Sequence, residues 1–265
     1  MRVVGDGPDL VLLHGWGLNA GIWQTIEPSL QSHFRLWMPD LPGHGQAPFS
    51  ADSRDLSAWV SYLLESLPER FFCLGWSLGG LLALDMALRQ PTRVERLALV
   101  ASNAQFACTD SWPHAMQPDV LNDFAEQLTT GFEKTLHRFL MLQAQGGEQT
   151  KDTIRHLKRH LAEQGTPQLV ALQAGLEILK RASLVDRLPA VKQPTALIYG
   201  QADRLVPAEA ASMMAQLLPH AQLSIIKNAG HAPFISHSEQ FVALVTLFFQ
   251  NKSIMLYAKP KKDDV

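Results

Sequence analysis

The sequence predicts an α/β protein: a mostly parallel central sheet flanked by helices, with an all-helical block inserted into the chain. Short apolar runs alternate with stretches of helical composition near both ends of the chain, as they do when helices join parallel strands. Between residues 105 and 187 only helical patterns follow one another. The motif Gly-Trp-Ser-Leu-Gly at residues 75–79 separates an apolar run from a helical one, which is the context of a nucleophile on a sharp strand-to-helix turn.

Each element follows from its local pattern. Apolar runs predict buried strands at residues 10–13, 34–38, 71–74, 97–100, 195–199 and 223–226. Helical composition in the same regions predicts helices near residues 22–30, 55–67, 81–88, 208–218 and 239–249, with Asp55 as an N-cap. The inserted block is expected to hold helices near residues 120–128, 132–142, 150–161 and 169–179.

This pattern predicts two structural units. Residues 1–104 and 188–250 should form the sheet core, and residues 105–187 a helical cap that lies over the sheet. Residues 259–265 are polar, and the whole tail at residues 251–265 is expected to be disordered.

Length and composition narrow the class of protein. The chain has 265 residues and a formal net charge of −2, and this net charge does not favour nucleic-acid binding. Its two cysteines do not make a disulfide framework. No apolar run reaches the ~18 residues of a membrane span, and residues 1–7 do not resemble a signal peptide. We therefore expect a cytoplasmic, monomeric protein that binds neither nucleic acid nor membrane.

No metal and no cofactor are expected. The sequence has no H-E-x-x-H motif, no paired C-x-x-C motif and no phosphate-binding glycine loop, and its histidines are scattered. The chemistry should therefore come from side chains of the chain itself.

Ser77 is the expected nucleophile. Gly75 and Gly79 let neighbouring backbone approach where a Cβ would clash, so that the chain can turn sharply around the serine. The helix that follows aims its free N–H groups and positive dipole end at whatever the serine attacks.

A serine hydroxyl needs a base to take its proton and an acid to orient that base. Active residues of parallel sheets lie in loops beyond the carboxyl ends of strands. His231 follows the last strand and is the expected base, whereas His14 and His44 lie in similar loops but are interpreted as structural. Asp203 follows the strand at residues 195–199 and is the expected acid, with Asp40 as its competitor.

The oxyanion of the tetrahedral intermediate needs two hydrogen-bond donors. One is the backbone N–H of Leu78, directly after the nucleophile, and the other is the backbone N–H of Trp16 in the loop after an earlier strand. The rings of Trp16 and Trp76 can equally be packing residues.

Five stretches carry a family resemblance: LLHGWGLNA at residues 12–20, DLPGHG at 40–45, LGWSLGG at 74–80, GLEILK at 175–180 and HAPFISH at 231–237. Through them the chain resembles the α/β-hydrolase superfamily. Within it, the chain looks closest to the pimeloyl-[acyl-carrier protein] methyl ester esterases of biotin synthesis.

The resemblance implies a triad of Ser77, Asp203 and His231, in agreement with the reasoning from the residues. It also implies further substrate contacts, beside the triad, from two positions near the nucleophile and one segment of the cap. These are Trp16, Leu78, Phe139, Leu140, Met141, Leu142 and Gln143.

An acyl carrier protein is the partner that the resemblance implies, docked on basic residues of the cap. Those residues are Lys134, Arg138, Lys151, Arg155, Lys158 and Arg159. In the helix expected at 150–161, the last three cluster at helical spacing, so they could steer an acidic carrier. An ordinary solvated face is the alternative.

The residues thus favour a serine carboxylesterase, and the resemblance implies that it acts on the methyl ester of pimeloyl-acyl-carrier protein and also on short-chain esters. Two alternatives stay open. One is another reaction of this superfamily, such as C–C bond hydrolysis or a lyase step in menaquinone synthesis. The other is a non-catalytic module that binds an acyl chain or a carrier.

Overall fold

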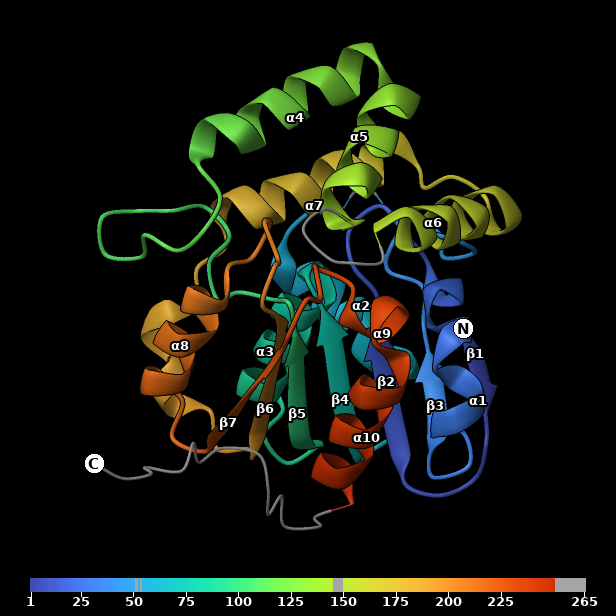
Figure 1. Cartoon of the computed structure of the whole chain (residues 1–265), viewed down its shortest axis with the longest axis vertical. Helices are drawn as coiled ribbons and strands as arrows, with labels where there is room; N and C mark the ends of the chain where they lie inside the picture. The colour runs from blue at the N-terminus through green and yellow to red at the C-terminus, as the bar shows by residue number, and fades with distance from the viewer. Residues whose placement is uncertain (51, 53, 145–149, 251–265) are drawn as a thin grey trace, which may run out of the picture.

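The computed structural model describes residues 1–50, 52, 54–144 and 150–250, and its centre is a seven-stranded sheet (Figure 1). The strands in sheet order are β1 (Arg2–Val4), β3 (Arg35–Met38), β2 (Asp9–Leu13), β4 (Phe71–Trp76), β5 (Val94–Val100), β6 (Thr195–Gly200) and β7 (Ala221–Ile226). All neighbouring pairs are parallel except β1 with β3. The predicted mostly parallel sheet is therefore confirmed.

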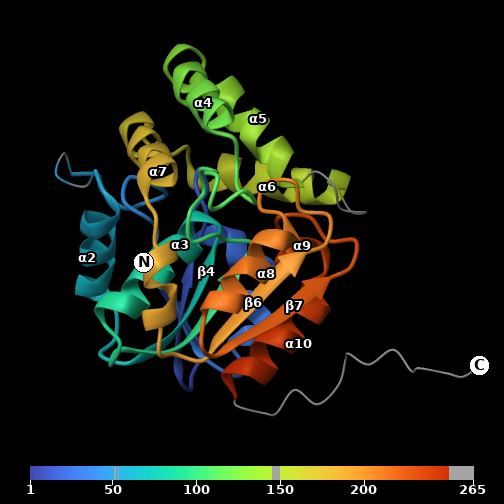
Figure 2. The same cartoon turned by 90° about the vertical axis from the view of Figure 1, so that its left-hand side faces the viewer.

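Helices cover both faces of this sheet. On one face lie α2 (Leu56–Ser66) and α3 (Leu78–Arg89), and on the other lies α10 (Ser238–Phe249) (Figures 1 and 2). Because both faces are covered, the inner strands can be apolar without interruption, and residues 10–13 of β2 are fully buried. Asp55 caps α2 as predicted, since its carboxylate accepts the N–H of Ala58 at 2.8 Å. The remaining helix beside the sheet is α8 (Ala208–Leu217).

Four helices follow β5 before the chain returns to the sheet at β6. They are α4 (Pro118–Thr130), α5 (Phe132–Ala144), α6 (Thr150–Gln164) and α7 (Leu169–Arg181). Figures 1 and 2 show them beyond the carboxyl ends of the parallel strands, on the side where the loops after β2, β4 and β6 also lie. This arrangement fits the expected cap, although the division of the chain into two domains stays a prediction.

Two local features differ from the sequence prediction. Strand β1 was not expected, because a three-residue edge strand with one arginine carries almost no apolar periodicity. The single helix expected at 22–30 is a 3-10 helix (Ala20–Thr25) followed by the short helix α1 (Glu27–Leu30). Pro28 is the physical reason, since it lacks the N–H that a continuous helix would need there. The expected disordered tail, 251–265, lies outside the described residues.

Two more short elements occur in the described part of the chain. They are a 3-10 helix (Val185–Ala190) before β6 and helix α9 (Pro233–Ser236) before α10. Within the described part of the chain, no helix is both long and apolar enough to cross a lipid bilayer.

A methyl group at Gly79 should break this fold. An added Cβ would lie 2.3 Å from the carbonyl oxygen of Leu13 and 2.5 Å from that of His14, so backbone would have to move. We expect Gly79→Ala to destabilise the protein by about 3 kcal/mol, the upper end for overpacking. The melting temperature should then fall by roughly 10 °C.

Gly131→Ala is the matched control, because the nearest atom to its added Cβ is 3.8 Å away. Thermal unfolding of both variants and the wild type, followed by circular dichroism, gives the three melting temperatures to compare. Equal melting temperatures for the two variants would show that the close approach at Gly79 is unimportant.

Candidate active site

The turn between β4 and α3 holds Ser77 in a strained conformation. Its φ is 55° and its ψ is −120°, outside the regions that residues with a Cβ favour. An added Cβ at Gly75 would lie 2.2 Å from the carbonyl oxygen of Gly79, and one at Gly80 would lie 2.4 Å from the side chain of Ser102. Only glycine fits at these positions, which confirms the expected role of Gly75 and Gly79 and extends it to Gly80.

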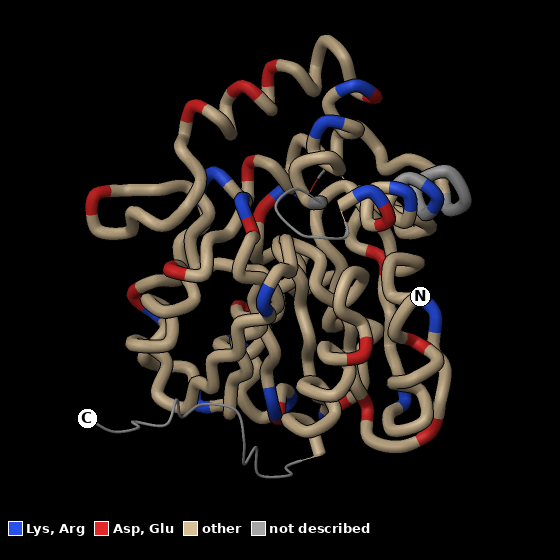
Figure 3. The backbone as a smooth tube through the Cα atoms, in the orientation of Figure 1, with Lys and Arg blue, Asp and Glu red and all other residues tan. Residues whose placement is uncertain are grey.

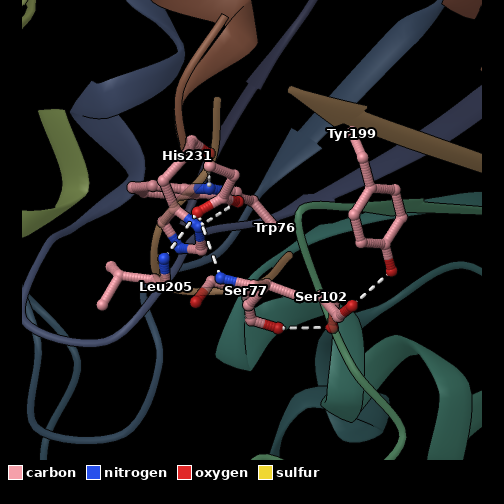
Figure 4. Close-up of polar contacts among 8 residues, drawn as sticks. Trp76, Ser77, Ser102, Tyr199, Leu205 and His231 are labelled. Carbon is pink, nitrogen blue, oxygen red and sulfur yellow. Dashed lines mark hydrogen bonds and ion pairs between the residues drawn. The ribbon is translucent and has the colours of Figure 1, made fainter. Parts of the chain in front are cut away.

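Hydrogen bonds from β5 and β6 hold the strained serine. Its backbone N–H donates to the carbonyl of Val100 at 3.0 Å. The hydroxyl of Ser102 donates to the carbonyl of Ser77 at 2.7 Å, and the hydroxyl of Tyr199 donates to the carbonyl of Ser102 (Figure 4). Burial raises the pKa of Tyr199, so this phenol stays protonated and remains a donor.

His231 and Asp203 form a buried pair. Nδ1 of His231 lies 2.8 Å from Oδ2 of Asp203. An ionised carboxylate can only accept, so Nδ1 carries the proton and Nε2 of the neutral ring keeps its lone pair. Nε2 is buried and has no hydrogen-bond partner within the described residues. The pair therefore presents one unused acceptor. The His231 ring lies against that of Trp76, the residue before Ser77, with centroids 5.5 Å apart (Figure 4).

The other carboxylate oxygen of Asp203 is held by backbone. Oδ1 accepts the N–H groups of Leu205 at 2.8 Å and Val206 at 3.1 Å. These two bonds fix the plane of the carboxylate and so the direction in which Oδ2 meets His231.

Asp40, the competing acid, is occupied elsewhere. Its Oδ1 accepts the N–H of Ala20 at 2.8 Å and its Oδ2 accepts the N–H of Gln46 at 2.9 Å. Both oxygens thus serve to shape the loop around Gly45, where an added Cβ would lie 2.4 Å from Oδ2.

His14 and His44 are buried and hold neighbouring loops. Nε2 of His14 accepts the N–H of Leu41 at 2.9 Å. Nδ1 of His44 lies 2.9 Å from the carbonyl of Pro42, and its Nε2 accepts the N–H of Gly17 at 3.3 Å. Burial lowers the pKa of His14, and it lowers the pKa of His44 to about 3, so both rings stay neutral. Their geometry fits the structural interpretation.

Two backbone N–H groups are free at this site. Those of Trp16 and Leu78 have no acceptor among the residues that the structure describes. The loop of Trp16 is tied to the cap, because its indole N–H donates to the carbonyl of Leu172 in α7 at 2.9 Å. An added Cβ at Gly175 would lie 2.9 Å from the Trp16 ring, so the glycine of GLEILK makes room for this tryptophan.

Comparison with known proteins agrees with this geometry. A model of the alpha/beta hydrolase fold matches residues 8–238. Two pimeloyl-[acyl-carrier protein] methyl ester esterases are similar over most of their length. The one from Aeromonas hydrophila is 42% identical and the match covers 92% of this chain and 96% of the relative. For the one from Serratia marcescens the identity is 44% and the coverage 93% and 96%.

The chain belongs to the α/β-hydrolase family. Solved structures share the fold at lower identity. An esterase from Exiguobacterium antarcticum superposes with a TM-score of 0.85 at 21% identity, and the match covers 94% of each chain. A bromoperoxidase from Bacillus anthracis gives the same TM-score at 19% identity and the same coverage. The fold is thus shared by an esterase and by a bromoperoxidase.

In this hydrolase, one face of α5 lies over the Trp16 loop. Phe139 packs edge-on against the Trp16 ring with centroids 4.6 Å apart, and Leu140 is fully buried. Gln143 is also fully buried, and neither polar atom of its side chain has a partner in the described part of the chain. Met141 is 39% exposed, on the other side of the helix. Met141 thus lies away from the face that carries Phe139 and Gln143, and the substrate contacts expected from this segment stay predictions.

Leu142 is half-buried and packs against the core, so its exposure is intermediate between those of Leu140 and Met141.

The basic residues expected to bind a carrier lie on α5 and α6, whereas acidic residues lie along α4 (Figure 3). Arg138 donates to the side chain of Gln127 at 2.8 Å, and Arg155 pairs with Asp152 at 3.0 Å.

Arg159 lies 3.2 Å from the ring of His156 within α6. Lys134 and Lys151 are exposed, and the side chain of Lys158 lies outside the described part. Within the described residues no group of three or more metal-ligating side chains occurs.

Sequence reasoning missed three residues that shape this site. Ser102, Tyr199 and Trp76 all bond to the backbone of Ser77, Ser102 or His231. Side-chain bonds to backbone carbonyls leave no periodicity or motif in the sequence. Only the Trp76 position carried a signal, because it lies inside the nucleophile motif.

Asp203→Asn should disable the site and Asp40→Asn should not. An asparagine at 203 supports the wrong imidazole tautomer, so we expect kcat on a short methyl ester to fall about 10⁴-fold with little change in KM. Asp40→Asn keeps one acceptor oxygen and should lower stability by about 1 kcal/mol. Steady-state kinetics and melting curves of both variants check this, and the reverse ranking would make Asp40 the acid.

Proposed function

We propose that this hydrolase is a serine carboxylesterase that cleaves the methyl ester of pimeloyl-acyl-carrier protein, releasing methanol and the pimeloyl carboxylate in biotin synthesis. The observation that carries the chemistry is the buried, unpartnered Nε2 of His231, oriented by Asp203, beside a serine on a strained turn. The relatives named above supply the substrate.

The proposed reaction proceeds through an acyl-enzyme. Oγ of Ser77 attacks the ester carbonyl while Nε2 of His231 takes its proton. The negative charge that develops on the carbonyl oxygen is stabilised by the free N–H groups of Trp16 and Leu78. His231 then gives its proton to the departing methoxide, so methanol leaves. Water attacks the acyl-enzyme with His231 as base, which frees the carboxylate and restores the Ser77 hydroxyl.

The proposed substrate places different demands on two parts of the molecule. The ester lies at the far end of an acyl chain, so the chain must pass the apolar face of α5 to reach Ser77. Phe139 and Leu140 on that face would contact the methylenes. Gln143 supplies a buried amide whose donors and acceptor are unused, which could pair with a polar group of the substrate.

The carrier should meet the basic side of the cap. Arg138, Arg155 and Arg159 are exposed there, whereas Asp119 and Asp123 give α4 the opposite sign (Figure 3). Acyl carrier proteins are acidic, so they should be attracted to α5 and α6 and repelled by α4.

The alternatives predict different behaviour. A C–C bond hydrolase or a lyase of this fold would not release methanol from a methyl ester through a serine acyl-enzyme. A non-catalytic binding module has no need for an oriented histidine and two free N–H groups around a strained serine. Hydrolysis of short-chain esters and a cytoplasmic, monomeric state are part of the proposal.

Ser77→Ala should abolish hydrolysis and leave the fold intact. Losing the nucleophile usually removes most of the rate, on the order of 10⁴-fold or more. Methanol release and labelling by a fluorophosphonate probe measure this, with Ser212→Ala on exposed α8 as the control. A Ser77→Ala variant that kept a tenth of the wild-type kcat would refute the mechanism.

Charge reversal on the cap should affect the carrier-bound ester alone. We expect Arg138→Glu, Arg155→Glu and Arg159→Glu together to raise KM for the carrier substrate about tenfold and to leave short methyl esters nearly unchanged. Added salt should mimic the variant, because exposed charges are screened beyond about 8 Å at physiological ionic strength.

Reversal of Arg70 and Lys192, at the opposite end of the sheet, is the control. Equal losses on both substrates would indicate a damaged cap. No loss on either would leave a short-chain esterase without a carrier-docking face.

A further inference from the structure

Trp76 is the last residue of β4 and directly precedes Ser77. Its ring is fully buried, and its indole N–H donates to the backbone carbonyl of His231 at 2.8 Å (Figure 4). The Trp76 and His231 rings also lie against each other, with centroids 5.5 Å apart. One side chain therefore joins the residue before the nucleophile to the backbone of the base.

In the described part of the chain, no other hydrogen bond joins Trp76 or Ser77 directly to His231. Nδ1 of His231 is used by Asp203 and Nε2 has no partner, so Ser77 and His231 are not bonded to each other. The sheet cannot link them directly either, because β5 and β6 lie between β4 and β7. The spacing between nucleophile and base depends on how the loop after β7 is held against the end of β4.

We propose that Trp76 is a positioning residue that sets the distance and orientation of His231 relative to Ser77 through this hydrogen bond. The inference rests on the proposed function, since it assumes that His231 takes the proton of Ser77. A misplacement of about 1 Å between reacting groups can cost about 10²-fold in rate, so a single bond of this kind can matter greatly.

The alternative is that Trp76 acts only as a packing residue. Its ring packs edge-on against Phe234 with centroids 5.0 Å apart. Trp23 offers a matched comparison, because it is also fully buried and lies against the same Phe234 ring at 4.7 Å. The indole N–H of Trp23 has no hydrogen-bond partner among the described residues. The two tryptophans thus share burial and the Phe234 neighbour, and they differ in the hydrogen bond.

Three variants separate the two roles. Trp76→Phe keeps an aromatic ring and removes the donor. Trp76→His has a smaller ring but can place an N–H where the indole N–H was, because imidazole overlays the five-membered ring of indole. Trp23→Phe removes the same volume as Trp76→Phe and no hydrogen bond.

The full chain should be assayed with a short methyl ester and with a fluorophosphonate that labels Ser77. For Trp76→Phe we expect kcat and the labelling rate to fall together by about 10- to 100-fold while KM changes less than about threefold. Trp76→His should recover a large part of both rates despite its greater loss of volume. Trp23→Phe should lower the melting temperature and keep the wild-type rates.

Several results would overturn the proposal. Wild-type rates in folded Trp76→Phe, or equal losses in Trp76→Phe and Trp76→His, would assign Trp76 to packing alone. Failure of both position-76 variants to fold, beside a folded Trp23→Phe, would do the same. These assays use a short methyl ester and no carrier protein. If the enzyme did not act on the carrier-bound ester, the test of Trp76 would therefore be unaffected. A wild-type enzyme whose Ser77 takes no label would refute the proposed mechanism itself.

Discussion

The close approach of backbone around the nucleophile turn is the constraint on which the rest of this structure depends. Added Cβ atoms at Gly75 and Gly79 would lie 2.2 and 2.3 Å from backbone carbonyl oxygens. Because no side chain intervenes, β4 can pass into α3 around a single residue, and that residue, Ser77, is left at positive φ. The helix N-terminus and its free N–H group are thereby placed beside the serine hydroxyl.

A strained residue persists only where its surroundings hold it, and here three neighbouring strands contribute. Ser102 after β5, Tyr199 of β6 and His231 after β7 are all linked to the turn by buried hydrogen bonds, the last through Trp76. Nε2 of His231 is an exception within this network, a buried acceptor without a partner. An unsatisfied buried group normally costs stability, and this one lies on a ring that packs against Trp76, the residue before Ser77, which is why we propose His231 as the base.

The cap and the core meet at Trp16. Its indole is bonded to the carbonyl of Leu172 in α7, and its ring lies against Phe139 of α5. A movement of α5 or α7 would therefore shift the Trp16 loop. In the proposed mechanism this loop supplies one of the two N–H groups for the oxyanion, so the helices after β5 and the proposed chemistry are linked through one side chain.

The sequence by itself determined the fold class, the positions of the main strands and helices, and the loops from which the site residues come. It could do so because burial leaves apolar runs, tight turns leave glycines, and the carboxyl ends of parallel strands meet at one edge. Asp203 was also the expected acid, because it follows the strand at residues 195–199. The three-residue strand β1 and the break at Pro28 were missed because their signals are local and weak.

Only the tertiary structure decided how the site is held together. Asp40 accepts two loop N–H groups, Met141 lies on the exposed side of α5, and Trp76 bonds to the backbone of His231, 155 residues away in the chain. The bonds of Asp40 and Trp76 have no sequence pattern, because a bond to a backbone N–H or carbonyl depends on where that group lies and not on the residue that carries it. Contacts between distant segments exist only once the sheet has brought their loops to one edge.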